Sequence, residues 1–126
     1  MCRPARILEE GAVYHVTCRG NNKGKVFHVG LDYRKYMLNL IKNKNKYKFY
    51  LYAYALLPNL LHILMKPKQE SELSHIMNSL NLSYAIWHNR RYDCVGHVLQ
   101  GRYGSRIIKD DRGMLICMSY IERNPI

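Results

Sequence analysis

The sequence lacks the features of a membrane or secreted protein. No stretch of its 126 residues approaches the roughly 20 apolar residues that a membrane-spanning helix needs. The basic residues after Met1 lead into no apolar segment, so we expect no signal peptide and a cytoplasmic location. Repeats, linkers and low-complexity segments are also missing, and 48% of the residues are hydrophobic. We therefore expect one globular domain over residues 1–126.

Cysteine is scarce, and no two cysteines have the spacing of a paired motif. The four cysteines are dispersed and form no Cys-x-x-Cys pair: Cys2, Cys18, Cys94 and Cys117. This pattern indicates reduced thiols, most of them small core residues, in place of a disulfide framework. The spacing of Cys94 and His97 is that of half a zinc site, but no second pair completes a tetrahedron.

Acidic residues are few. Nine Asp and Glu stand against 20 Lys and Arg, which gives a formal net charge of +11. Such an excess on a small chain favours a polyanionic partner. The basic residues are scattered along the whole chain, which fits a nucleic acid better than a membrane surface.

The hydrophobic spacing predicts the order β-α-β-β-α-β-α. Strands are indicated by β-branched and aromatic residues, and helices by apolar residues three and four apart. A Pro58-Asn59 turn between two strands predicts a hairpin. The predicted elements are residues 13–18, 31–47, 48–57, 60–66, 71–91, 105–108, and a helix from 110 that ends before Pro125. Two β-α-β halves predict an α+β, ferredoxin-like antiparallel sheet with helices on one side and an additional C-terminal helix.

The strand at residues 48–57 carries apolar or amphipathic side chains on both faces. This predicts a central strand, because a central strand is covered on both sides. Its row of tyrosines, Tyr50, Tyr52 and Tyr54, has two interpretations. We favour core packing over a stacking platform for single-stranded bases.

Two regions combine basic and amide side chains. The glycine-rich segment at residues 19–25 is either a mobile surface turn or a loop that contacts phosphates with cations and backbone N–H groups. The second long helix ends in two arginines, and the loop at residues 92–104 adds a glutamine and another arginine. The predicted DNA contacts are Arg19, Asn21, Lys23, Lys25, Arg90, Arg91, Gln100 and Arg102.

His62 is the one residue of its strand that sheet packing does not require. Leu60, His62 and Leu64 share a strand face. Tyr120 and Asn124 are four apart on the last helix and share a face offset from its core stripe. The alternatives are a partly buried strand histidine without a ligand and an amphipathic helix tyrosine.

Four segments resemble the REP-associated tyrosine transposases and the wider HUH family of single-strand DNA transposases. They occur in the order that the family has and span nearly the whole chain. The segments are GAVYHVT at residues 11–17 with Arg19-Gly20-Asn21, YALLPN at residues 54–59 with His62-Ile63-Leu64, GHVLQGRY at residues 96–103, and Tyr120-Ile121 with Asn124-Pro125-Ile126.

The resemblance implies metal-assisted cleavage of single-stranded or hairpin DNA. In this family a helix tyrosine, here Tyr120, attacks a DNA phosphate, remains joined to the 5′ side and frees a 3′ hydroxyl. A His-hydrophobic-His triplet binds Mg²⁺ or Mn²⁺; His62 matches its second histidine, and Asn124 matches the polar helix residue that completes the site. The resemblance further implies palindromic DNA as partner, a nucleoid-associated bacterial protein without membrane attachment, and a monomer or homodimer.

One position departs from this pattern. Leu60 stands where the triplet has its first histidine. We expect the cation to be weakly bound or lost and cleavage to be weak or absent, while DNA binding persists. The alternative function is therefore a catalytically inactive, domesticated protein that recognises palindromic repeats. A third interpretation, an RNA-binding ferredoxin-like domain, lacks the aromatic signature of such domains.

Overall fold

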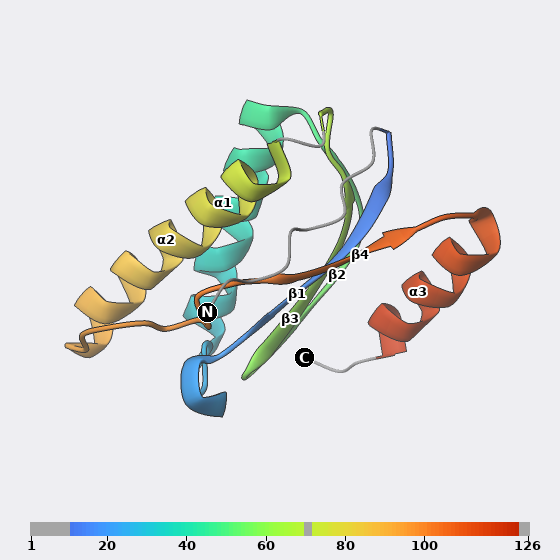
Figure 1. The fold of residues 1–126 in the computed structure, drawn as a ribbon. Helices are drawn as coiled ribbons and strands as arrows, with labels where there is room; N and C mark the ends of the chain where they lie inside the picture. The colour runs from blue at the N-terminus through green and yellow to red at the C-terminus, as the bar shows by residue number, and fades with distance from the viewer. Residues whose placement is uncertain (1–10, 70–71, 124–126) are drawn as a thin grey trace, which may run out of the picture.

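A computed structural model describes residues 11–69 and 72–123 of the chain, and it has the predicted α+β architecture (Figure 1). The element order β-α-β-β-α-β-α is confirmed. The elements are β1 (Val13–Arg19), a short 3-10 turn η1 (Asn21–Lys23), α1 (Gly30–Tyr47), β2 (Tyr50–Leu57), β3 (Leu60–Lys66), α2 (Glu72–Tyr92), β4 (Gly104–Ile108) and α3 (Asp111–Arg123).

The four strands form one antiparallel sheet in the order β2-β3-β1-β4. β2 and β3 form the predicted hairpin, in which Leu57 pairs with Leu60 across the Pro58-Asn59 turn. β3 then pairs with β1, which is far from it in sequence, so β1 and β3 occupy the centre. This is the strand order of a ferredoxin-like fold, with each β-α-β half crossing over the sheet.

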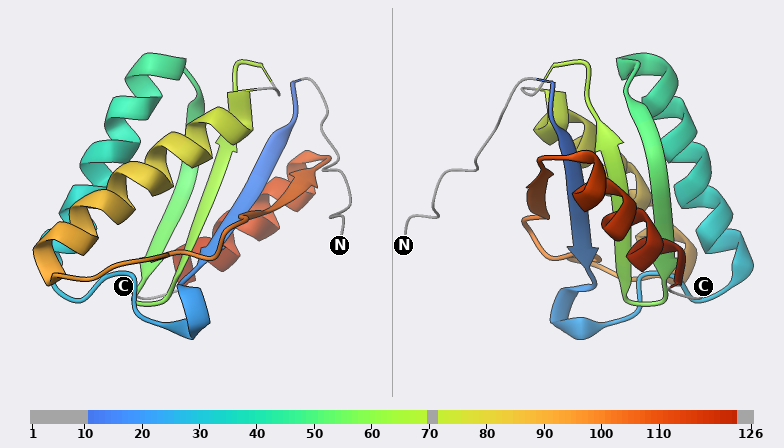
Figure 2. Two further views of the ribbon diagram at one scale, coloured as in Figure 1. Left: turned by 60° about the vertical axis from the view of Figure 1, so that its left-hand side comes forward. Right: turned by 90° about the vertical axis from the view of Figure 1, so that its right-hand side faces the viewer.

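α1 and α2 pack side by side on one face of the sheet, whereas α3 covers the other face (Figure 2). The larger core lies between the sheet and α1 and α2. Its largest fully buried side chains include three tyrosines, Tyr14, Tyr36 and Tyr84. The hydroxyl of Tyr84 donates to the Val26 carbonyl at 2.6 Å, and that of Tyr36 to Asn81 Oδ1 at 2.9 Å. Each polar tip is therefore satisfied while its ring fills the core.

A smaller core holds α3 against the sheet. Ala55 and Leu64 of the sheet are buried with Cys117 and Ile121 of the helix. Since α3 contributes two buried residues one turn apart, it contacts the sheet along a narrow stripe. This packing places α3 over the strand face that carries His62.

The prediction that residues 48–57 form a central strand is wrong. β2 is an edge strand, and the register shifts by a bulge between Leu51 and Ala53. The favoured core role of the tyrosines is also wrong, because Tyr50, Tyr52 and Tyr54 are 63%, 37% and 42% exposed. Among the described residues, β2 has a strand partner on one side only, which is β3.

Two helices differ from the predicted stripes. Ile41 of α1 and Leu115 of α3 are exposed, although their spacing placed them in the core. The side of α1 toward α2 instead buries two amides, Asn39 and Asn43. The predicted range of the second helix, 71–91, begins at Ser71, which lies outside the described residues.

Within the described ranges, no helix combines the length and apolar character that a membrane crossing requires. Cys18 and Cys117 are buried thiols, as predicted, and Cys94 is exposed. No group of three potential metal-ligating His, Cys, Asp or Glu side chains occurs in residues 11–69 and 72–123.

Candidate functional site

The sheet face toward α3 carries the polar residues of β1 and β3. Thr17 pairs with His62, and Arg19 pairs with Leu60, in the antiparallel register. His15 is two residues before Thr17 and therefore shares its face. The central strands thus bring His15, Thr17 and Arg19 beside His62, although 47 residues separate the two histidines.

The two imidazoles contact each other directly. His15 Nε2 lies 3.1 Å from His62 Nδ1, and the ring centroids are 5.2 Å apart in a stacked arrangement. The residues are only 8% and 4% exposed. Burial, with help from His62 and Arg106, lowers the pKa of His15 to about 4. Burial and the charge of Arg19 also lower the pKa of His62. Both rings are consequently neutral near pH 7, and one ring nitrogen donates to the other.

Leu60 begins β3 and faces Arg19 across the strand pair. The first histidine of the implied triplet would therefore lie next to a guanidinium and two residues from His62. The side chain that is present can neither coordinate a cation nor hydrogen-bond to a phosphate.

Tyr120 belongs to α3, the helix that covers this face. Its neighbour Ile121 is buried against the sheet in the smaller core. The Tyr120 side chain is outside what the structure describes, and Asn124 lies outside the described residues. α3 thus runs over the strand face of His62, while the proposed roles of Tyr120 and Asn124 stay predictions.

A cavity of about 580 Å³ opens at the end of β1. Backbone hydrogen bonds build it: Asn21 N donates to the Val98 carbonyl and Gln100 N donates to the Arg19 carbonyl, each at 2.9 Å. Gly20 lies between Arg19 and Asn21 in the tight turn after β1, where a Cβ atom would clash with the Gly24 carbonyl oxygen. The segment that precedes β4 is in this way fastened to the loop after β1.

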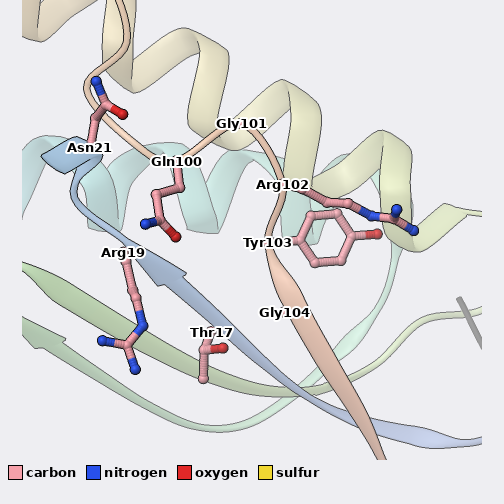
Figure 3. Close-up of a pocket in the computed structure, with 8 residues that line it drawn as sticks. All are labelled: Thr17, Arg19, Asn21, Gln100, Gly101, Arg102, Tyr103 and Gly104. Atoms are coloured by element: carbon pink, nitrogen blue, oxygen red, sulfur yellow. The ribbon is translucent and has the colours of Figure 1, made fainter. Parts of the chain in front are cut away.

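Four of the eight predicted DNA contacts line this cavity: Arg19, Asn21, Gln100 and Arg102. Figure 3 shows the Gln100 side chain between the loop and β1, the Arg19 and Thr17 side chains on the other side of β1, and Arg102 extending away along Tyr103. Thr17 completes the wall nearest to the sheet. Cationic and amide groups therefore gather within one open hollow, at the edge of the strand face that holds His62.

The other four predicted contacts lie elsewhere. Lys23 and Lys25 are exposed on the loop that follows β1. Arg90 lines a separate groove between α1 and α2. Arg91 forms an ion pair with buried Asp32, with Nε 3.6 Å from Oδ1, and its guanidinium lies 5.7 Å from the Trp87 ring. Arg91 is thus already engaged within the fold.

The described residues do not form the cation site that the resemblance implies. Leu60 occupies one ligand position, and His62 Nδ1 is paired with His15. The two imidazoles contact each other, but no third His, Cys, Asp or Glu of the described residues joins them as a potential ligand. Mg²⁺ and Mn²⁺ prefer several oxygen ligands in near-octahedral geometry, which two nitrogens and a leucine do not supply.

Residues 10–124 match the family model described as "Transposase IS200 like". The chain belongs to this family. The match covers all four segments that carried the resemblance except the last two residues of the final one. The predicted relationship is therefore confirmed. No curated protein matches the sequence.

Two solved structures share the fold. One is a REP-associated tyrosine transposase bound to a REP hairpin, with 17% identity, a TM-score of 0.80, and coverage of 99% of this chain and 73% of that chain. The other is a candidate transposase from Deinococcus radiodurans, with 13% identity, a TM-score of 0.63, and coverage of 97% and 96%. At these identities the similarity establishes the architecture of the chain, including the C-terminal helix across the sheet.

Sequence reasoning missed His15 and Thr17 as members of this face. His15 lies in the segment YHVT, whose composition indicates only a strand. Its alternation with Thr17 and Arg19 is the signal that could have identified a polar strand face. Nothing local in the sequence indicates that this face would meet His62.

Proposed function

We propose that the chain is a DNA-binding protein of the transposase family that recognises single-stranded or hairpin DNA at the cavity beside β1. The observation that carries the proposal is that one cavity is lined by Arg19 at the end of β1, Asn21 in the turn after it, and Gln100 in the segment before β4, which backbone hydrogen bonds fasten together. A guanidinium attracts phosphate, and amides hydrogen-bond to base edges. Its partner in solution is palindromic DNA, as the hairpin bound to the similar structure suggests.

The surroundings support binding more strongly than catalysis. The net charge of +11 attracts a polyanion at long range. The histidine pair is buried and neutral, so it offers little to a phosphate. We therefore place DNA recognition first and regard this chain as a binder whose strand-cleaving chemistry is weak or lost through Leu60.

Strand cleavage by Tyr120 is the second candidate, favoured by the position of α3 over the face of His62. In this step the phenolic oxygen forms a bond to phosphorus and loses its proton to solvent. The bond from phosphorus to the 3′ oxygen breaks, and that oxygen takes up a proton. The DNA 5′ end is left on the tyrosine. Arg19 would then hold the strand beside the reacting phosphate.

One experiment separates these functions. The native chain and Tyr120→Phe are incubated with Mn²⁺ and labelled single-stranded DNA that contains a hairpin. Binding is followed by fluorescence anisotropy, and covalent attachment by denaturing electrophoresis. We expect both proteins to bind equally and neither to form an adduct. An adduct formed by the native chain and absent from Tyr120→Phe would establish the enzyme instead. Absence of binding at low salt would contradict the proposal as a whole.

A further inference from the structure

A second basic surface lies between α1 and α2, on the side of the sheet away from α3 (Figure 2). It is a groove of about 420 Å³. Its rim carries the cations Lys35, Lys42, Lys46 and Arg90, and none of the described residues that line it is acidic. The three lysines are seven and four residues apart on α1 and thus share one helix face.

The floor of this groove is polar. Asn39 and Asn43 line it although they are only 6% and 7% exposed. Asn43 Nδ2 donates to the Asn39 carbonyl at 2.8 Å, but Asn39 Nδ2 and Asn43 Oδ1 find no hydrogen-bond partner among the described residues. Buried amides normally have such partners. Unsatisfied amides beneath a ring of cations favour a hydrated anion over an apolar helix as the occupant.

A third hollow lies next to both the groove and the cavity beside β1. Between them lies a hollow of about 450 Å³, bounded by α2 and the segment that precedes β4. This hollow shares Ile86 with the groove, and Gln100, Gly101 and Tyr103 with the cavity. The basic groove and the cavity therefore border the same hollow, with α2 between the groove and the hollow.

We propose that the groove between α1 and α2 binds the phosphate backbone of the double-stranded stem of the same DNA whose unpaired part enters the cavity. The inference rests on the proposed function, because the unpaired DNA bound in the cavity would determine where the stem lies. From Lys35 to Lys46 the helix rises about 16 Å at 1.5 Å per residue. Phosphates of one duplex strand are about 3.4 Å apart along the axis, so several lie within reach of this rim.

Charge and shape favour duplex DNA over other anionic partners. The cations lie on both sides of the groove, on α1 and on the end of α2, as one strand of a duplex backbone would require. Proximity to the cavity also favours DNA over an acidic peptide or a lipid surface, because one DNA molecule can contact both the groove and the cavity. A stem held here and an unpaired segment held at Arg19 would let one protein bind both parts of a hairpin.

The test uses two DNA probes and two matched variants of the full chain. One probe is a hairpin with a stem longer than a helical turn and an unpaired 5′ flank; the other is the flank alone. Lys42→Gln/Lys46→Gln removes two groove cations. Arg34→Gln/Lys44→Gln removes two cations from exposed positions of α1 that do not line the groove. Thermal unfolding verifies that both variants are folded, and anisotropy titrations at several salt concentrations give affinity and salt slope.

We expect the groove variant to weaken hairpin binding by about an order of magnitude and to lower its salt slope by about two, since each lost duplex phosphate contact contributes about 0.9. The groove variant and the control variant should bind the flank alone with equal affinity. Equal hairpin affinities for the two variants would overturn the inference while leaving the proposed function intact. If the groove variant loses binding only to anionic phospholipid vesicles and not to the hairpin, the groove belongs to a membrane contact, and the inference is overturned as well. If the native chain binds neither probe, the proposed function fails and this inference with it.

Discussion

His15 Nε2 and His62 Nδ1 lie 3.1 Å apart on the two central strands, within a sheet face that α3 covers. The contact joins the first strand of the chain to the strand of the implied metal triplet. Because both imidazoles are buried and their pKa values are lowered, the pair is a neutral hydrogen bond near pH 7 and not a pair of cations. The two rings stabilise each other's position.

This contact predicts energetic coupling between the two histidines. His15→Ala should lower the free energy of unfolding by about 1–3 kcal/mol, because it removes one partner of a buried hydrogen bond. A double-mutant cycle with His62→Ala should give a coupling of about 0.5–1.5 kcal/mol, measured by urea unfolding at pH 7. Exposed His75→Ala serves as control and should change little. Strictly additive effects of the two substitutions would contradict the contact.

Leu60→His should restore a His-hydrophobic-His triplet on β3. We expect Mn²⁺ affinity, measured by isothermal titration calorimetry, to rise by at least about tenfold, since a further imidazole donor joins His62 on the same strand face. The same variant should yield a covalent DNA adduct if Tyr120 retains its role, and Leu60→His/Tyr120→Phe should not. Leu60→Gln is the polar control, because it matches the change in polarity without an imidazole. Unchanged Mn²⁺ affinity in Leu60→His would show that the lost ligand is not at this position.

Arg19→Gln should weaken binding to single-stranded DNA and reduce its salt slope by about 0.7, the contribution of one phosphate contact. Arg19 is exposed, lines the cavity and lies at the end of β1, so the substitution leaves the core unchanged. Arg34→Gln removes the same charge from an exposed position near the beginning of α1 that does not line the cavity, and it is the matched control. Anisotropy titrations over a range of salt concentrations measure both quantities. Identical slopes for the two variants would remove Arg19 from the binding surface.

Asp32 ties the beginning of α1 to the end of α2 and predicts a pH-dependent stability. Its carboxylate accepts hydrogen bonds from His28 N at 2.8 Å and from the Tyr92 hydroxyl at 2.5 Å, and Arg91 is 3.6 Å away. Burial alone would raise the pKa of Asp32, but these hydrogen bonds and the arginine outweigh it and lower the pKa below 3.8.

A carboxyl group whose pKa is lower in the folded state contributes stability above its unfolded-state pKa and loses it as the pH falls through the folded-state value. Asp32→Asn should therefore cost about 1.5–3 kcal/mol at pH 7, because hydrogen bonds to a buried charge are lost. The difference between native chain and variant should shrink below about pH 4, as measured by urea unfolding across the pH range. A difference that stays constant down to pH 2 would show that the charge of Asp32 is irrelevant to stability.

Much of the fold followed from local signals. The 3.6-residue and two-residue periods gave every helix and strand in order, and the Pro58-Asn59 turn gave the hairpin that presents His62. The edge position of β2 did not follow, because strand order depends on which distant strands pair and not on the residues of one strand. The bulge between Leu51 and Ala53 also divides the row of tyrosines, because Tyr50 lies opposite Lys66 and Tyr54 opposite Ile63, on opposite faces of β3.

The sequence by itself determined that this is a basic α+β protein of the transposase family, and that Leu60 interrupts its expected histidine triplet. Periodicity, net charge and motif order can all be read along the chain without knowing which segments contact each other. Only the tertiary structure decided that His15 is the partner of His62, and that Arg19, Asn21 and Gln100 share one cavity. It also placed three lysines and Arg90 around a second groove. These arrangements depend on pairing between segments tens of residues apart, which no local pattern encodes.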